Sequence, residues 1–330
     1  MTPAMLSIRG LVKHYELTRS VAQRLLGKPQ AWVHAVNNVS LEIQRGETLG
    51  LIGESGCGKS TLGRTVLRLH EPTAGSIHFD GSDITRAASD TMTRLRARMQ
   101  IVFQDPYASL NPRRTVREIV DLPLMIQGLA DRAEREDRVR SMLKRVGLRD
   151  EQFGRYPHQF SGGQRQRIGI ARALVTHPDL VVCDEPVSAL DVSIKAQILE
   201  LLSELKDELG LTYLFISHDI AVVSYLADRI AVMYLGEIVE VGPTREVMDA
   251  PRHPYTQALM SAVPRVEVHG RRQRIVLKGD LPSPIDPPAG CKFHTRCAQA
   301  MPRCATEAPR AVAMNEDGSH HASCFLYDNS

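Results

Sequence analysis

The stretch GESGCGKS, residues 53–60, decides the fold class of this chain. It fits the pattern G-x-x-x-x-G-K-[ST] and stands between an apolar run at residues 49–53 and a helical pattern at residues 59–69. Glycines let the backbone wrap around a phosphate so that N–H groups face its oxygens, and the start of a helix adds its positive end. A chance glycine turn would not explain the order strand, loop and helix. We therefore predict a site for nucleotide phosphates.

Two side chains of this loop have expected tasks. Lys59 is predicted to reach the β- and γ-phosphates, and the Ser60 hydroxyl to bind Mg²⁺. Cys57 has two interpretations: a small side chain that fills space, which we favour, or a thiol whose modification blocks nucleotide binding. The residues predicted to contact the nucleotide from the loop and the helix start are Gly53, Glu54, Ser55, Gly56, Cys57, Gly58, Lys59, Ser60 and Thr61.

A second element, LVVCDE at residues 180–185, is an apolar run that ends in two carboxylates. The carboxyl ends of strands are where α/β sheets bind ligands. Asp184 is predicted to hold Mg²⁺ through water, and Glu185 to orient or deprotonate the attacking water. The alternative is a pair that only caps the next turn, but the phosphate loop in the same chain favours the catalytic interpretation.

A third element, FSGGQRQR at residues 160–167, precedes a helical pattern. Ser161 is a good N-cap, and Gly162 and Gly163 leave backbone amides bare at a helix start, which makes a second anion site. Two phosphate-binding helix starts are hard to use on one nucleotide. We therefore expect the second site to face the nucleotide of a neighbouring copy.

With these three elements together, residues 5–250 resemble the ATP-binding subunits of ABC transporters, whose signature is Ser-Gly-Gly-Gln at a helix start. Other landmarks of that family follow in order along the chain. The resemblance implies that Gln104 contacts the metal and the membrane subunit, and that His218 contacts the γ-phosphate. It adds to the ATP site the signature and D-loop residues Ser161, Gly162, Gly163, Gln164 and Asp191.

The resemblance also implies a mechanism. Two such domains hold two ATP molecules between them, head to tail, and closure on ATP and opening after hydrolysis drive a membrane partner. Tyr15 stands where the family stacks an aromatic ring on adenine, with Trp32 and His34 as nearby rivals. The implied catalytic residues are Glu185, His218 and Gln104, and the implied Mg²⁺ ligands are Ser60, Gln104 and Asp184.

Length and composition limit the alternatives. The 330 residues indicate roughly two domains, and 43% hydrophobic with 24% charged residues is ordinary for a globular protein. The 41 basic and 38 acidic residues leave a formal charge of +3, so composition gives no case for nucleic acid. No apolar run approaches the roughly 18 to 20 residues that span a bilayer, and no signal-peptide pattern is present. We expect a peripheral subunit at the cytoplasmic face of the inner membrane.

Strand and helix patterns alternate along residues 1–250, which predicts an α/β fold, here a P-loop ABC-type nucleotide-binding domain. Residues 105–176 carry helical spacing and are predicted to form a helical subdomain, in which the mixed charges of residues 132–140 make a solvated face rather than a basic surface. Short runs rich in branched or aromatic side chains predict strands at residues 6–13, 39–43, 49–53, 99–103, 180–183, 212–216 and 229–233.

After residue 250 the chain becomes rich in proline, which marks a smaller, loop-rich C-terminal module at residues 251–330. PRHPYTQAL at residues 251–259 and QDPYASLNP at residues 104–112 resemble oligopeptide and dipeptide importer ATPases. Such importers use two unlike ATPase subunits, and GQRQR at residues 163–167 resembles the F-type partner. The resemblance implies a heterodimer that binds two permeases, works with an external solute-binding protein and powers peptide uptake.

Two alternatives stay open for the function. Related importers carry nickel or glutathione, so the cargo is not fixed by the resemblance. A soluble ABC-type ATPase that acts on nucleic acid is a candidate of another class. The near-neutral charge disfavours it, because binding to phosphate backbones usually takes a strongly basic face, and no nucleic-acid partner is expected.

Four of the six cysteines stand near the end of the chain, at Cys291, Cys297, Cys304 and Cys324. Reduced thiols in a module that buries little apolar surface predict a metal centre, and four thiolates suit Zn²⁺ or a 4Fe-4S cluster. Members of the peptide-importer family carry an iron–sulfur cluster on similarly placed cysteines. The resemblance therefore favours 4Fe-4S over zinc, with free thiols as the third interpretation.

Three other features have structural interpretations. Cys183 is expected to pack in the core, and His320 and His321 to lie in a solvated tail. A basic cluster is expected on a solvated surface rather than against lipid headgroups, and it consists of Arg265, Arg271, Arg272, Arg274 and Lys278.

Overall fold

The computed structural model describes residues 4–19, 29–129, 131–263, 275–277 and 279–328. The chain forms two compact units. Unit 1 consists of Met1–Leu6, Ile43–Thr48 and Phe79–Ser217, and unit 2 of Ser7–Glu42, Leu49–His78 and His218–Ser330. The basic cluster expected between Arg265 and Lys278 lies outside the described residues.

Unit 1 contains three parallel strands, β6 (Met99–Val102), β7 (Leu180–Asp184) and β8 (Thr212–Ile216). β7 lies between the other two, with Met99 opposite Leu180 and Leu180 opposite Thr212. Every residue of β7 and β8 is buried, as expected for apolar strands covered on both faces. The structure confirms the three strands predicted here, and Cys183 packs in the core as expected.

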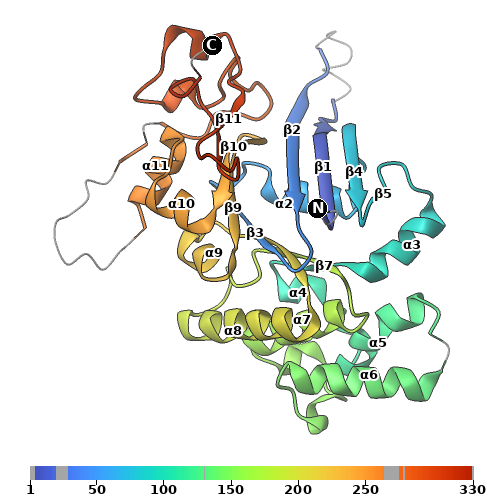
Figure 1. The fold of residues 1–330 in the computed structure, drawn as a ribbon. Helices are drawn as coiled ribbons and strands as arrows, with labels where there is room; N and C mark the ends of the chain where they lie inside the picture. Colours follow the sequence, from blue (N-terminus) through green and yellow to red (C-terminus); the bar gives the residue numbers. More distant parts are fainter. Residues whose placement is uncertain (1–3, 20–28, 130, 264–274, 278, 329–330) are drawn as a thin grey trace. The chain divides into compact units, whose positions relative to one another are not determined.

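Helices make up most of the remainder of unit 1, and four of them lie in the described part of the helical subdomain predicted over residues 105–176. α5, α6 and α7 contact one another in pairs (Figure 1). α5 begins with a capping box between Thr115 and Glu118, and α6 begins at the Asp131 cap. The helices are α3 (Ser89–Arg98), α4 (Pro106–Ser109), α5 (Val116–Ile126), α6 (Arg132–Arg145), α7 (Gly162–Leu174) and α8 (Val192–Leu209).

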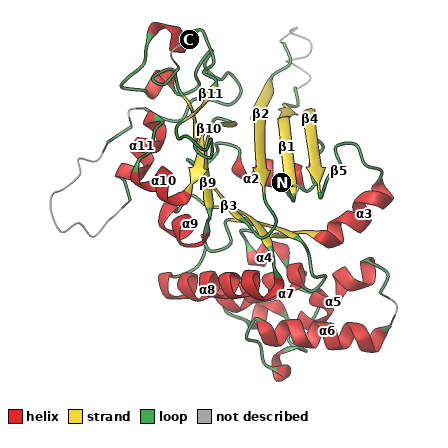
Figure 2. Cartoon of the chain, in the orientation of Figure 1, coloured by secondary structure: helices red, strands yellow, loops and turns green. Residues whose placement is uncertain are grey.

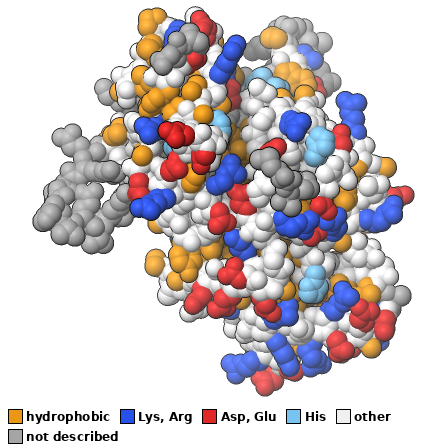
Figure 3. Space-filling model, in the orientation of Figure 1, with side chains coloured by type: hydrophobic (Ala, Val, Ile, Leu, Met, Phe, Trp, Pro, Cys, Tyr) orange, Lys and Arg blue, Asp and Glu red, His pale blue; other side chains and the backbone are white. Residues whose placement is uncertain are grey.

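The charged side chains of α6 form ion pairs, as the sequence predicts. Arg138 lies 2.6 Å from Glu134 one turn away, and Arg135 lies 3.0 Å from Asp121 of α5. Basic and acidic side chains are interspersed over these helices (Figure 3). Arg135, Arg138, Arg140 and Arg145 of this helix therefore all pair with carboxylates of the same unit.

Unit 2 contains two sheets. One has the order β2-β1-β4, formed by β1 (Leu6–Glu16), β2 (Trp32–Ile43) and β4 (Ala74–Phe79). In the other, β3 (Thr48–Ile52) pairs in parallel with β9 (Arg229–Tyr234), and β9 turns into antiparallel β10 (Glu237–Pro243). The strands predicted at residues 6–13 and 39–43 exist but are longer and belong to a separate sheet.

The C-terminal module continues the second sheet. β10 pairs with β12 (His321–Ser323), which pairs with β11 (Ala311–Ala313). Figure 2 shows most of the remaining described part of the module as loop, in agreement with the loop-rich prediction. This hairpin was not predicted from the sequence, because three-residue strands carry too little periodicity to detect.

The helices of unit 2 flank these sheets. They are α2 (Lys59–Val66), α9 (Ile220–Leu226), α10 (Thr244–Asp249) and α11 (Pro254–Ser261). Three buried aromatic rings join α11 and the C-terminal module to the end of β9: the centroid of Tyr234 lies 4.7 Å from that of Tyr255 and 5.2 Å from that of Phe293. Within the described ranges, no helix has the length and hydrophobicity that a membrane crossing needs.

His320 corrects one prediction of the sequence analysis. It is not in a solvated tail: only 2% of the residue is exposed. Its Nε2 lies 2.8 Å from Glu240 Oε1, and its Nδ1 lies 3.2 Å from Glu246 Oε2. The reason is the pairing of His321 with Val241, which brings the preceding residue against two carboxylates. His321 is half-buried in β12.

Candidate functional site

The phosphate loop of unit 2 has a backbone that only glycine can follow. Gly53 and Gly58 have φ angles of 154° and 107°. A Cβ at Gly53 would lie 2.2 Å from Met233 O, and one at Gly58 would lie 2.0 Å from Ala35 O. Both obstacles are backbone atoms, which cannot move aside as a flexible side chain can. The fold therefore requires the two glycines that the motif contains.

Lys59 lies inside the loop, with its Nζ donating to Gly53 O at 2.8 Å and to Glu54 O at 3.0 Å. α2 begins at this residue, after Gly58, and has no side-chain cap and no acidic residue in its first turn. Nothing in that turn therefore opposes an anion at the positive end of the helix. Ser60 and Thr61 follow, both half-buried.

Cys57 is buried in the loop, with its Sγ 3.8 Å from Lys59 Nζ. Burial raises the pKa of its thiol, although Lys59 acts in the opposite direction. A protonated, buried thiol is a poor nucleophile. The environment favours the space-filling interpretation over the reactive one.

The carboxylate pair at the end of β7 lies in unit 1. Asp184 is 1% exposed, and Glu185 follows it with a φ of 48°, a left-handed conformation. Gln104 Nε2 donates to Glu185 Oε2 at 3.0 Å. The structure thus brings together the amide and the carboxylate that were both predicted to act on ATP.

The signature sequence also lies in unit 1, at the start of α7. Ser161 Oγ accepts from Gln164 N at 3.3 Å, and Gln164 Oε1 accepts from Ser161 N at 3.1 Å, which completes a capping box. A Cβ at Gly163 would lie 2.5 Å from Ile194 Cγ2 of α8. Asp191, the cap residue of α8, is exposed near this helix start.

Two arginines of α7, neither of them predicted from the sequence as a site residue, connect this helix to the segment that follows Gln104. The Arg165 guanidinium lies 3.6 Å from the centroid of the Tyr107 ring, and Arg172 Nη1 donates to Ser109 O. The two arginines are seven residues apart and therefore share one face of the helix. The spacing indicates a shared helix face, but it does not show which segment that face contacts.

The predicted residues are thus divided between the two units. Unit 2 holds the phosphate loop and His218, which is exposed just after β8. Unit 1 holds Gln104, Asp184, Glu185 and the signature.

Comparisons with known proteins agree with this set of motifs. The model of the ABC transporter family matches residues 36–188, and that of the oligopeptide/dipeptide transporter C-terminal region matches residues 239–304. A putative peptide import ATP-binding protein of Brucella ovis is 52% identical over 325 residues, 98% of each chain. The chain belongs to the ATP-binding proteins of oligopeptide/dipeptide ABC transporters. Members of this family are ATPases.

Other relatives and solved structures support the same assignment. This ABC ATPase is 50% identical to the oligopeptide transport ATP-binding protein AppF of Bacillus subtilis, over 98% of its own length and 97% of AppF. It is 46% identical to the dipeptide transport ATP-binding protein DppF of Escherichia coli, with coverages of 96% and 93%. The ATP-binding cassette MJ0796, solved as a dimer bound to ADP and Pi, matches with a TM-score of 0.64 and 32% identity, over 73% of this chain and 99% of that one.

Tyr15, the candidate for adenine stacking, is half-buried in β1 of this ABC ATPase. Its ring meets His70 edge to face, with centroids 5.6 Å apart, and Lys13 Nζ lies 4.8 Å from its centroid. Of the rivals, Trp32 is exposed and His34 packs on His14 with centroids 4.2 Å apart. These contacts do not single out one of the three rings, so the assignment to Tyr15 stays a prediction.

The four C-terminal cysteines of this ABC ATPase lie in one module and form no disulfide. Cys291 N donates to Cys304 O at 2.9 Å. The pKa of Cys291 rises to about 11, mainly by burial and further through Cys304, Cys324 and Cys297. The donors suit a metal chemically, but the described residues hold no group of three or more His, Cys, Asp or Glu side chains placed to bind one. The predicted metal centre is not confirmed.

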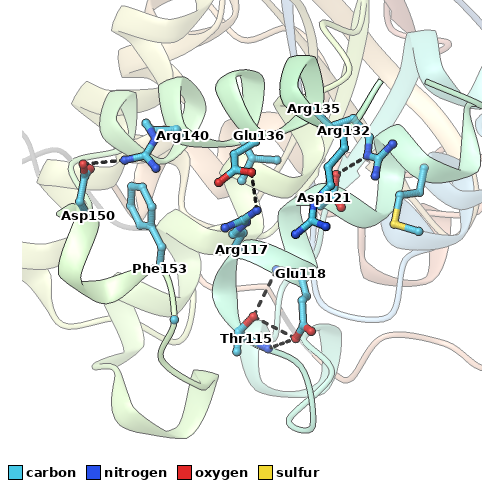
Figure 4. Close-up of a pocket in the computed structure, with 13 residues that line it drawn as sticks. Thr115, Arg117, Glu118, Asp121, Arg132, Arg135, Glu136, Arg140, Asp150 and Phe153 are labelled. Carbon is cyan, nitrogen blue, oxygen red and sulfur yellow. Dashed lines mark hydrogen bonds and ion pairs between the residues drawn. The ribbon is translucent and has the colours of Figure 1, made fainter. Parts of the chain in front are cut away.

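A pocket of about 740 Å³ lies in unit 1, between α5, α6 and the segment that follows α6 (Figure 4). Charged side chains that line the pocket form ion pairs with one another: Arg117 lies 2.8 Å from Glu136, and Arg140 lies 2.9 Å from Asp150. No residue predicted from the sequence to bind ATP lines it. The pocket therefore contributes no group to the ATP site.

Proposed function

We propose that this ABC ATPase hydrolyses ATP to power the uptake of di- or oligopeptides through an ABC importer. The observation that carries the proposal is the continuous match to peptide transport proteins: the C-terminal region model covers residues 239–304, beyond the ATPase motifs, and the relatives align over nearly the whole chain. The C-terminal region separates this group from ABC ATPases in general.

The proposed roles in ATP hydrolysis follow from chemistry and position. Lys59 would exchange its bonds to Gly53 O and Glu54 O for bonds to phosphate oxygens. Glu185, held by Gln104, would accept the proton of the attacking water.

We propose that Mg²⁺ is held by three oxygen donors that the motifs supply. The donor set suits this hard cation, since it offers hydroxyl, amide and carboxylate oxygens. When bound, Mg²⁺ neutralises charge on the phosphates. The ligands of this proposal are Ser60, Gln104 and Asp184.

We further propose that the signature helix acts on ATP bound by a second, non-identical ATPase subunit. The capping box of Ser161 fixes the start of α7, and Asp191 is exposed near it, so both can face a partner. The segment that contains Tyr107 is fastened to α7 and would transmit movement of that helix to a permease. Two permeases, an external solute-binding protein and a peripheral position at the cytoplasmic face complete the proposed assembly.

We propose to place the domain boundary near residue 250, with the ATP-binding domain before it, its helical subdomain at about residues 105–176 and the peptide-importer module after it. The C-terminal region model, which begins at residue 239, supports a boundary in this part of the chain.

We also keep, as a proposal, a metal site on Cys291, Cys297, Cys304 and Cys324, with 4Fe-4S favoured over Zn²⁺. The support is the presence of four free thiols in one small module, in which Cys291 N donates to Cys304 O at 2.9 Å. In this proposal the metal is structural or redox-sensing and takes no part in hydrolysis. Visible absorbance together with the iron and zinc content of anaerobically purified protein tests it, and a colourless preparation without either metal contradicts it.

Transport by the complete assembly tests the proposed function. The chain is reconstituted in proteoliposomes with two permeases and a second ATPase subunit from the same source, and a solute-binding protein is added with labelled dipeptide or oligopeptide. We expect ATP-dependent uptake that Lys59→Ala abolishes. Uptake of nickel or glutathione instead contradicts the peptide cargo, and ATPase activity stimulated by DNA or RNA without permeases contradicts the transport function.

A further inference from the structure

Glu54, the second residue of the phosphate loop, is held by the C-terminal module. Its N–H donates to Tyr255 Oη at 2.8 Å. Its carboxylate accepts from both terminal nitrogens of Arg296, with Nη1 2.7 Å from Oε2 and Nη2 3.1 Å from Oε1. Its carbonyl is also one of the two that accept from Lys59. The residue therefore connects the phosphate-binding lysine to two side chains more than 200 residues away.

Arg296 is fixed in place by its surroundings. Only 8% of its side chain is exposed. It ends a short 3-10 helix, His294–Arg296, and its N–H donates to Phe293 O at 3.0 Å. Phe293 is one of the buried aromatic rings, and the guanidinium lies 6.0 Å from the centroid of Tyr234, another of them. A bidentate ion pair made by an arginine that is held in this way is both strong and directional.

The charge of this pair matters because of where it lies. A carboxylate in a loop that receives a polyphosphate makes the electrostatic potential more negative at the place where the phosphates bind. The partial burial of Glu54 limits the screening of this charge by salt. A bound guanidinium cancels that charge. Its two hydrogen bonds also keep the Glu54 side chain from rotating into the loop.

We propose that Arg296 is a positioning residue for ATP: by neutralising and orienting Glu54, it lets the C-terminal module set the ATP affinity of the phosphate loop. The proposal rests on ATP binding at that loop, which is tested separately on the wild-type chain. It assigns to the module an effect on the ATPase itself, in addition to any contact with transporter partners.

Arg296→Gln in the full chain tests the proposal. It leaves the Glu54 carboxylate uncompensated, so we expect the Kd for MgATP, measured by calorimetry, to rise about tenfold. In the assembled transporter the KM for ATP should rise with it while kcat stays near the wild-type value, because no group that touches the reacting atoms changes. Wild-type Kd and KM in a folded Arg296→Gln protein contradict the proposal.

The double variant Glu54→Gln/Arg296→Gln separates charge from general damage. It carries no uncompensated carboxylate, so it should bind MgATP more tightly than Arg296→Gln alone. Affinity as weak as that of Arg296→Gln alone overturns the neutralising role. The double variant also serves if Arg296→Gln does not fold, because it lacks the buried unpaired charge.

Arg303→Gln is the matched control. Arg303 belongs to the same module and donates to Phe325 O at 2.9 Å and Asp328 O at 3.0 Å, with its guanidinium 4.3 Å from the Phe325 ring centroid. We expect its loss to lower the thermal midpoint without changing the Kd for MgATP. A Kd shift equal to that of Arg296→Gln would show that any damage to the module weakens ATP binding, and would contradict a specific role of Arg296.

Discussion

The two helix starts predicted to bind phosphate are built in opposite ways. α7 begins at Ser161, whose side chain and that of Gln164 form a reciprocal capping box within four residues. α2 begins after Gly58 in a left-handed conformation and has no side-chain cap. The signature start is therefore stabilised by its own sequence, whereas the phosphate loop depends on distant backbone and side chains.

The difference has a functional reason. A helix start that wraps around a phosphate needs its backbone amides for the ligand, so a side-chain cap would compete with it. The loop is shaped from outside instead, by Ala35 O and Met233 O on its glycines and by Tyr255 and Arg296 on Glu54. The ordering of the ATP site is thus shared with the C-terminal module of unit 2.

The largest expected effect comes from adding one methyl group to the phosphate loop. Gly58→Ala forces a Cβ to within 2.0 Å of Ala35 O at a φ of 107°. The loop must deform, so we expect ATP affinity to fall at least about a hundredfold. Gly128→Ala is the control: its φ is 79°, but nothing lies within 4 Å of the added Cβ. Equal ATP affinity in the two variants by calorimetry would contradict the external shaping of the loop.

The next largest effect is the pH dependence of folding stability that comes from His253, the residue that accepts a hydrogen bond from Tyr255 N. His253 caps α11, with its Nδ1 accepting from Tyr255 N at 3.1 Å, and burial lowers its pKa to about 4, although Glu240 acts in the opposite direction. The unfolded chain binds this proton near pH 6.5, so folding stability is lost as the pH falls from 6.5 towards 4. The contribution lost between pH 7 and pH 4.5 is about 2 to 3 kcal/mol.

His253→Asn isolates this contribution, because asparagine can accept the same capping hydrogen bond but does not titrate. The difference in unfolding free energy between pH 7 and pH 4.5, from urea denaturation, should be smaller in the variant by that amount. Glu237, whose pKa burial raises to about 7, contributes in the opposite direction but equally in both proteins. The same pH dependence in both would contradict a buried neutral His253.

The smallest effect is expected at the start of α7, which is capped by its own Ser161. Ser161→Ala removes the capping box and should cost about 1 kcal/mol of unfolding free energy. ATP affinity of the isolated chain should stay unchanged, while ATPase activity of the assembled transporter falls, since the signature serves the partner's nucleotide. A loss of ATP affinity in the isolated chain would contradict that division of labour.

The same contrast explains what the sequence could reveal. Local patterns predicted the phosphate loop, the Ser161 cap and the strand at residues 212–216 with its observed bounds. Contacts between distant segments gave no such signal: Arg296 and Glu54 are 242 residues apart. A surface histidine and a buried one look alike in sequence, and only strand pairing moved His320 into the interior.

The Gln104–Glu185 contact is an intermediate case. The two residues are 81 positions apart, yet the strands that precede them, β6 and β7, are neighbours in register. Parallel pairing brings the ends of adjacent strands to one edge, so both predicted site residues meet there. No pattern gave the contact of Arg165 with Tyr107, because it depends on how α7 packs against α4.

The most direct test of the central claim is ATP turnover and ATP binding by Glu185→Gln in the assembled transporter. The glutamine keeps an oxygen that can accept from Gln104 Nε2 but cannot take a proton from water. We expect hydrolysis to fall at least about a hundredfold while the Kd for MgATP stays within about twofold of wild type. Turnover near the wild-type rate would contradict the account of this ATPase.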